Sequence, residues 1–222
     1  KSRQSLLDAL MRKITKIEYQ KKNKERFNIY LDDEYGFSID MNILIKYSLQ
    51  KNMELSDDII DEILNAEERI IVYNYGISVL SKTAKSEHEL MLKMMDKGFD
   101  SQLIDNAINK LKEQKYLDDK RYCEMYINDK INISKHGVLK IKEALYYKGI
   151  DKEIIEEKIK NISSEEREKT ALALAQKKAL GIEEEDVRKK GIKLYNYLLS
   201  RGFEYETVKK TVKKILETEF DD

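Results

Sequence analysis

The stretch Lys97-Gly98-Phe99-Asp100 recurs twice further along the chain, and its three copies decide how the last two thirds of the protein folds. The other copies are Lys148-Gly149-Ile150-Asp151 and Arg201-Gly202-Phe203-Glu204. In each copy a basic residue precedes a glycine, the residue that most often ends a helix in the left-handed conformation. An apolar residue then anchors the turn, and an acidic residue stands where a following helix needs an N-terminal partner. Each copy therefore predicts a corner between two helices.

The residues on both sides of the three glycines agree in register. Apolar residues stand eight and four positions before each glycine, and again six, ten and thirteen positions after it. These positions hold Leu90, Met94, Ile104, Ile108 and Leu111 in the first copy, Ile141, Leu145, Ile155, Ile159 and Ile162 in the second, and Leu194, Leu198, Val208, Val212 and Ile215 in the third. Such spacings are helical, so each copy predicts two amphipathic helices that share a core.

A further helix is expected before each pair, over residues 67–81, 119–133 and 165–180. Ser163 with Glu166 has the spacing of a capping box, and Asp118 is a plausible N-cap. The sequence thus predicts three tandem three-helix repeats, at residues 67–117, 118–162 and 163–222. Repeats that contact only their neighbours form extended arrays, so the expected fold is mainly α, an elongated and curved array.

Residues 1–66 have a different pattern and predict a small α/β module. Apolar residues alternate with polar ones over Lys13–Gln20, Phe27–Leu31 and Tyr35–Ile39, as in half-buried strands. Asp32-Asp33-Glu34 predicts a turn, so these segments would form a three-stranded antiparallel sheet. Two short helices, Met41–Leu49 and Ser56–Leu64, are expected to cover its apolar face, because a bare small sheet is only marginally stable.

Composition limits the classes of protein to which the chain can belong. Its 222 residues include 42 basic and 42 acidic side chains, so no global field attracts a polyanion and any such site must be a local patch. Cys123 is the only cysteine, which favours a reducing compartment. No apolar run approaches the length of a membrane span. We therefore expect a soluble, cytoplasmic protein that makes no contact with a membrane.

The sequence offers no constellation that predicts catalysis. The glycines are scattered singly, and His88 and His136 have no partner at metal-ligand spacing. Cys123 stands beside Tyr126 and Ile127 on a predicted helix, which favours a small buried residue over a nucleophile. We expect no catalytic residue, no metal and no cofactor, and hence a protein that is not an enzyme.

The strongest local charge imbalance lies between residues 130 and 148, where five lysines accompany one glutamate. Basic residues also stand at all three glycine corners. The candidate DNA- or filament-binding residues are Lys130, Lys135, His136, Lys140, Lys142, Lys148, Lys97 and Arg201. The alternative for this set is an ordinary solvated helix surface. Tyr146 and Tyr147, beside the patch, could stack on bases, or one of them could belong to the core.

These residues carry a family resemblance that covers about residues 70–217. The first repeat resembles that of the RecX family of recombinase regulators in its Gly98-Phe99 and Leu117-Asp118-Asp119 signatures. The segments that resemble the second and third repeats are Ile133–Gly137 with Lys148–Ile150, and Lys193–Phe203 with Tyr205 and Val208. The front region, Ile14 to Asp58, is similar to the extra segment of longer family members.

The resemblance implies a regulator that binds the RecA recombinase assembled on single-stranded DNA and lies in the groove of that filament. Such a protein restrains ATP hydrolysis, strand exchange and filament growth. Its partners would be the RecA filament and single-stranded DNA, contacted directly or within the filament, and we expect the chain to be a monomer. Two alternatives remain: a helical nucleic-acid-binding protein that acts without a recombinase, and a helical scaffold for another protein.

Overall fold

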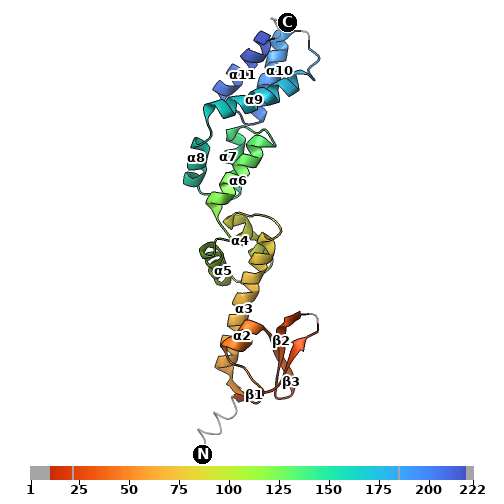
Figure 1. Ribbon diagram of the computed structural model, residues 1–222, viewed down its shortest axis with the longest axis vertical. Coiled ribbons are helices and arrows are strands. Elements are labelled where there is room, and N and C mark those ends of the chain that lie inside the picture. The colour runs from red at the N-terminus through yellow and green to blue at the C-terminus, as the bar shows by residue number, and fades with distance from the viewer. Residues whose placement is uncertain (1–10, 22, 185, 219–222) are drawn as a thin grey trace, which may run out of the picture. The chain divides into compact units, whose positions relative to one another are not determined.

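The computed structural model describes residues 11–21, 23–184 and 186–218 (Figure 1). The chain divides into two compact units. The first unit contains residues 1–81 and 94–114, and the second contains residues 82–93 and 115–222. The division passes through the helix that begins at Glu87, so the first repeat contributes to both units.

The first unit begins with an antiparallel sheet whose strands are ordered β3-β2-β1-β4. The three predicted strands are present as β1 (Met11–Gln20), β2 (Asn23–Leu31) and β3 (Glu34–Asp40). Alternation buries Phe27, Ile29 and Leu31 on one face, as the pattern predicts. The predicted turn is also present, because Asp32 and Asp33 connect β2 to β3 with positive φ angles of 52° and 68°.

The prediction of three strands was wrong by one strand. A fourth, β4 (Glu54–Ser56), pairs with Met11–Lys13 at the start of β1. It buries Leu55 but is only three residues long, too short to show an alternating pattern in the sequence. Ser56 ends this strand and also caps the following helix through its side chain.

The two helices predicted at 56–64 and 67–81 are one continuous helix, α3 (Asp57–Leu80). No glycine occurs in α3 before Gly76, and the protein contains no proline, so nothing breaks the helix at residue 66. Its first half covers the sheet together with the short helix α2 (Met41–Lys46). Its second half packs on α5 (Ser101–Glu113), where a Cβ on Gly76 would lie 2.8 Å from Leu111 Cδ1.

Glu67, near the middle of α3, connects this helix to the sheet. It is 4% exposed, and its carboxylate accepts a 2.7 Å hydrogen bond from the amide of Asp40 and pairs with Arg26 at 2.7 Å. A buried charge needs such partners. One helix therefore carries both the sheet module and the first pair of packed repeat helices.

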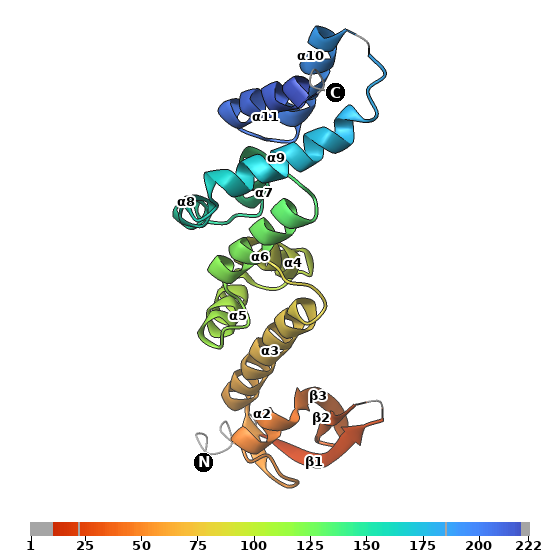
Figure 2. The same cartoon turned by 45° about the horizontal axis from the view of Figure 1, so that its top comes forward.

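The remaining helices have the predicted threefold organisation (Figure 2). The first repeat continues with α4 (Glu87–Asp96) and α5. The second repeat is α6 (Asp119–Asn132), α7 (Val138–Tyr147) and α8 (Lys152–Lys160). The third is α9 (Ser164–Ala179), α10 (Val187–Ser200) and α11 (Tyr205–Thr218), with α9 packed on both of its companions.

All the residues predicted from the register around the three glycines are core residues. The least buried of them, Val212, is 9% exposed. The glycines themselves adopt the left-handed conformation, with φ of 89° at Gly98, 74° at Gly149 and 82° at Gly202. The predicted corners are confirmed, and Asp100 and Asp151 cap the helices that follow the first two.

Gly202→Ala should destabilise the protein more than Gly98→Ala does. Both changes force alanine into a left-handed conformation, which costs about 1–2 kcal/mol. A Cβ at Gly202 would also lie 2.4 Å from Lys140 Cβ, whereas nothing lies within 4 Å of one at Gly98. We expect an extra cost of about 1–3 kcal/mol at Gly202, measurable by urea denaturation. Equal losses of stability in the two variants would contradict this packing.

Candidate nucleic-acid interface

Within the second unit, the start of α4 packs on the glycine corner between α7 and α8; we call this contact joint 1–2. Ser86 begins α4 with a capping box, donating its own amide to Glu89 Oε2 at 3.2 Å and accepting the Glu89 amide on Oγ at 3.1 Å. Its hydroxyl also donates to the Lys148 carbonyl at 2.6 Å. A Cβ on Gly149 would lie 2.3 Å from His88 Cβ, so only glycine fits the corner.

The start of α7 packs on the corner between α10 and α11; we call this contact joint 2–3. The Gly137 amide donates to the Arg201 carbonyl at 2.9 Å, and the Leu139 amide donates to the Gly202 carbonyl at 3.0 Å. A Cβ on Gly137 would lie 2.2 Å from the Gly202 carbonyl carbon. The two backbones touch directly, so the corner glycine is also a contact between repeats.

Joint 2–3 gathers five of the predicted binding residues around its rim. They are Lys130, Lys135, His136, Lys140 and Arg201. Lys130 pairs with Asp129 at 3.0 Å and lies 5.1 Å above the Tyr126 ring. The Arg201 guanidinium lies 5.2 Å from the Tyr197 ring centroid. Lys135 has a φ of 53°, which turns the chain sharply before α7, and the His136 amide donates to the Lys130 carbonyl at 2.9 Å.

The pKa of His136 depends on the positive charges of this cluster. Burial lowers the pKa of its imidazole, and the positive charges of Lys140, Arg201 and Lys130 lower it further. At joint 1–2, by contrast, the pKa of Glu89 is lowered and that of Lys148 is raised by the opposite charge of the other. The rim of joint 2–3 is therefore a site where an added negative charge would be favoured.

The other three predicted residues lie elsewhere. Lys142 contacts both carboxylate oxygens of Glu156 at 2.8 Å, on α8. Lys148 lies at joint 1–2, where it pairs with Glu89 at 2.5 Å. Lys97 is exposed at the first glycine corner, which belongs to the first unit. The structure thus assigns internal acidic partners to Lys142 and Lys148, whereas Lys140 and Arg201 have none among the described residues.

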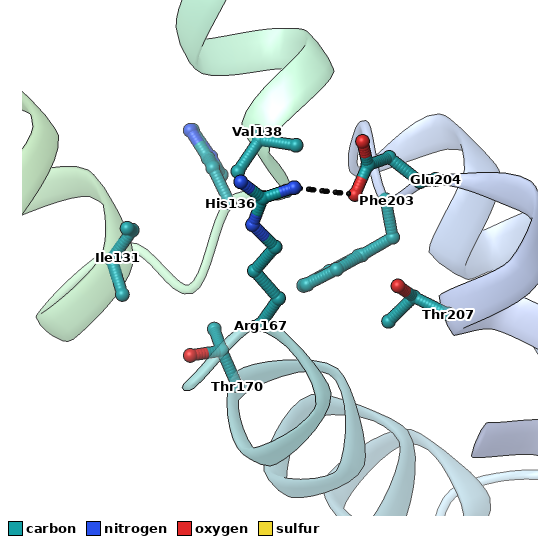
Figure 3. Close-up of a pocket in the computed structure, with 9 residues that line it drawn as sticks. Ile131, His136, Val138, Arg167, Thr170, Phe203, Glu204 and Thr207 are labelled. Atoms are coloured by element: carbon teal, nitrogen blue, oxygen red, sulfur yellow. Dashed lines mark hydrogen bonds and ion pairs between the residues drawn. The ribbon is translucent and has the colours of Figure 1, made fainter. Parts of the chain in front are cut away.

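A small pocket lies behind joint 2–3, between α6, the start of α7, α9 and the third corner (Figure 3). Arg167 of α9 points across it and donates to Glu204 at 2.9 Å and to the Ile159 carbonyl at 3.0 Å. Phe203, His136 and Gly137 complete the wall. Arg167 and Glu204 are 37 residues apart, so no local sequence pattern predicts that they pair.

The exposed side of α7 carries an apolar surface next to the basic rim. A shallow groove there is lined by Leu139, Lys142, Glu143, Tyr146 and Tyr147. Tyr146 is 43% and Tyr147 is 82% exposed, so the structure places neither of them in the core. Tyrosine is common at the centre of protein interfaces and also stacks on nucleic-acid bases.

Two further observations bear on chemistry. Cys123 is fully buried, and burial raises the pKa of its thiol to about 11, so it stays protonated and unreactive. Over the described ranges, His, Cys, Asp and Glu side chains form no group of three that could hold a metal ion. In the same part of the chain, no helix has the length and apolar character needed to cross a membrane.

Comparison with known proteins finds relatives over nearly the whole chain. Residues 12–56 match the family model described as "Regulatory protein RecX N-terminal domain". Residues 73–111, 118–159 and 165–212 match the first, second and third three-helix domains of RecX. These matches correspond to the sheet and to the three repeats seen in the structure.

Individual relatives agree with the family models. "Regulatory protein RecX" of Clostridium perfringens (strain 13 / Type A) is 38% identical over 95% of this chain and 99% of its own length. The protein of that name from Clostridioides difficile (strain 630) is 32% identical over 91% of this chain and 95% of its own. A crystal structure of regulatory protein RecX superposes with a TM-score of 0.75 at 29% identity, covering 91% of this chain and 99% of that one.

Lys140→Gln should raise the pKa of His136 toward the ordinary value of about 6.5, because it removes one of the charges that oppose protonation. In the native protein the folded-state pKa lies below the unfolded one. Stability should therefore fall as the pH drops through 6.5, and the loss should be complete below the folded-state pKa. The His136 imidazole resonances, followed by NMR against pH, measure the shift. Lys142→Gln is the control, and an unchanged His136 pKa in Lys140→Gln would contradict the assigned cluster.

Proposed function

The chain belongs to the RecX family of regulatory proteins, and from that premise we propose that it binds the RecA recombinase assembled on single-stranded DNA. Bound in the groove of the filament, it inhibits ATP hydrolysis, strand exchange and filament growth. It does this as a cytoplasmic protein and as a monomer, by binding alone and without a catalytic step.

The observation that carries the proposal is the set of cations around joint 2–3. Lys140 and Arg201 have no carboxylate partner within the described chain, although the protein as a whole is neutral. Unpaired cations attract phosphates, and each phosphate contact releases a counterion from the nucleic acid. These cations support a contact between joint 2–3 and the DNA backbone.

The neighbouring groove on α7 suits the protein component of the filament. Glu156 neutralises Lys142 in this groove, and Glu143 adds a negative charge. The groove is therefore less favourable for phosphate than the basic rim. Leu139, Tyr146 and Tyr147 offer apolar and aromatic area of the kind that protein interfaces bury. DNA contacts at the rim and protein contacts on α7 would act together, so modest individual affinities combine by avidity.

The direct test is ATP hydrolysis by RecA on single-stranded DNA, titrated with the full chain. We expect inhibition at less than one chain per recombinase subunit, because each bound chain would affect several subunits or block filament growth. No inhibition at a large excess, beside clear binding of the chain to DNA alone, would favour a nucleic-acid-binding protein that acts without the recombinase.

The double variant Lys140→Gln/Arg201→Gln should bind single-stranded DNA more weakly and inhibit the recombinase less. A plot of log affinity against log salt concentration has a negative slope, and loss of two phosphate contacts should make this slope less steep by about 1.4. Fluorescence anisotropy at several salt concentrations measures this slope. The matched control, Lys152→Gln/Lys160→Gln, removes two exposed cations from α8 and should change neither property. Equal effects of the two double variants would mean that only the net charge matters and that joint 2–3 is not the site.

A further inference from the structure

The two joints can be compared residue by residue, because they use equivalent positions. Ser86 and Gly137 each stand twelve residues before the corner glycine of their own repeat, and each begins the helix that enters a joint. Three residues further on are Glu89 in joint 1–2 and Lys140 in joint 2–3. In the glycine corner on which each of these helices packs, Lys148 and Arg201 directly precede the glycine.

Joint 1–2 contains opposite charges at these positions. Glu89 Oε1 pairs with Lys148 Nζ at 2.5 Å, and Tyr122 donates its hydroxyl to Glu89 Oε2 at 3.1 Å. Although burial disfavours the charged form, the bonds from Lys148 and the Ser86 amide lower the pKa of Glu89. Lys148 also lies 5.7 Å from the Tyr122 ring centroid. The joint is therefore closed by charges that the chain supplies itself.

Joint 2–3 contains like charges at the same positions. The Lys140 backbone lies against the corner, since a Cβ on Gly202 would be 2.5 Å from Lys140 N and 2.4 Å from its Cβ. Arg201, the next residue back, directs its guanidinium onto Tyr197 and not onto an acid. Two acids on segments that adjoin this joint already have basic partners, Asp129 with Lys130 and Glu204 with Arg167.

A third pair of equivalent residues also differs between the two joints. Tyr122 and Arg167 each stand four residues after the N-cap of their helix, Asp118 and Ser163 respectively. Tyr122 supports the acid of joint 1–2, whereas Arg167 adds another cation beside joint 2–3. Its buried Nε atom has no hydrogen-bond partner in the described structure. Equivalent segments form the two joints through different contacts, and the charge at the position of Glu89 and Lys140 is reversed in sign.

We propose that joint 2–3 is a latch that a phosphate polyanion closes. Phosphate oxygens that bridge Lys140 and Arg201 supply the negative charge that Glu89 supplies within joint 1–2. Without them the two cations repel each other, and the hydrogen bonds from the Gly137 and Leu139 amides to the third corner open more often. The anion therefore fixes the third repeat against the second, while joint 1–2 stays closed in either condition.

In this latch, binding of DNA at joint 2–3 would control how firmly the third repeat is held against the second. The latch rests on the proposed function only in taking DNA as the source of the phosphates. Free polyphosphate shares the same chemistry, so both sources enter the test. With a bound polyanion, the second and third repeats would move as one rigid body. In the free chain, the contact between them would open more often.

Amide hydrogen exchange, measured by NMR on the full chain without recombinase, tests the latch. The probes are sodium tripolyphosphate and a single-stranded thymidine oligonucleotide, each compared with sodium chloride at equal ionic strength. We expect either polyanion to slow exchange at the Gly137 and Leu139 amides by roughly two- to fivefold, the range of an exposed charge pair. Protection by the oligonucleotide alone would still support the latch and would assign it to nucleic acid. Unchanged exchange with both probes would overturn the proposal, whatever the protein does to a recombinase.

Charge variants distinguish the latch from simple binding. Lys140→Glu recreates the arrangement of joint 1–2 and should slow exchange at both amides without any polyanion, leaving no further response. Lys140→Gln, a milder change, should give part of the same protection. Glu89→Lys is the mirror variant, and should speed exchange at the Glu87 amide, which donates to Asp119 at the start of α6. A Lys140→Glu protein that responds to tripolyphosphate as the native chain does would contradict the latch.

Discussion

The direct contact between two backbones at a glycine corner is the constraint on which the second unit depends. At joint 2–3 the Gly137 and Leu139 amides reach carbonyls of the third corner, and a side chain at Gly137 or Gly202 would hold the segments apart. The left-handed glycine thus does two things: it ends one helix, and it lets the next repeat approach closely. Core packing stabilises each repeat, but the corner determines how neighbouring repeats in this unit are joined.

Although equivalent segments of the repeats form the two joints, side chains at equivalent positions give them different electrostatics. At joint 1–2, Glu89 contacts Lys148 and Tyr122, so the positive charge there is neutralised within the chain. At joint 2–3, Lys140 lies at the equivalent position beside Arg201, so the positive charge is not neutralised. A neutral protein can therefore still present a local site for a polyanion. The tyrosines and Leu139 on α7 lie next to that site, which allows nucleic acid and protein to be contacted together.

The sequence predicted the repeats well because their signals are local. Glycine corners, helical spacing and caps act within a few residues, and all the core positions derived from them are buried. It failed at β4, which is too short to show a period, and at the continuity of α3. The basic patch was identified as a set, but its division was not predictable, since Lys142 and Lys148 meet acids 14 and 59 residues away. Only the fold shows which cations remain unpaired.

A pair of double-mutant cycles tests the central claim most directly: that equivalent positions of the repeats carry opposite electrostatics at the two joints. One cycle neutralises Glu89 and Lys148, and the other neutralises Lys140 and Arg201, with free energies of unfolding measured at low salt and without polyanions. We predict a favourable coupling at joint 1–2 and an unfavourable one at joint 2–3, each of about 0.2–1 kcal/mol. Couplings of the same sign at both joints, or none at joint 2–3, would contradict the account.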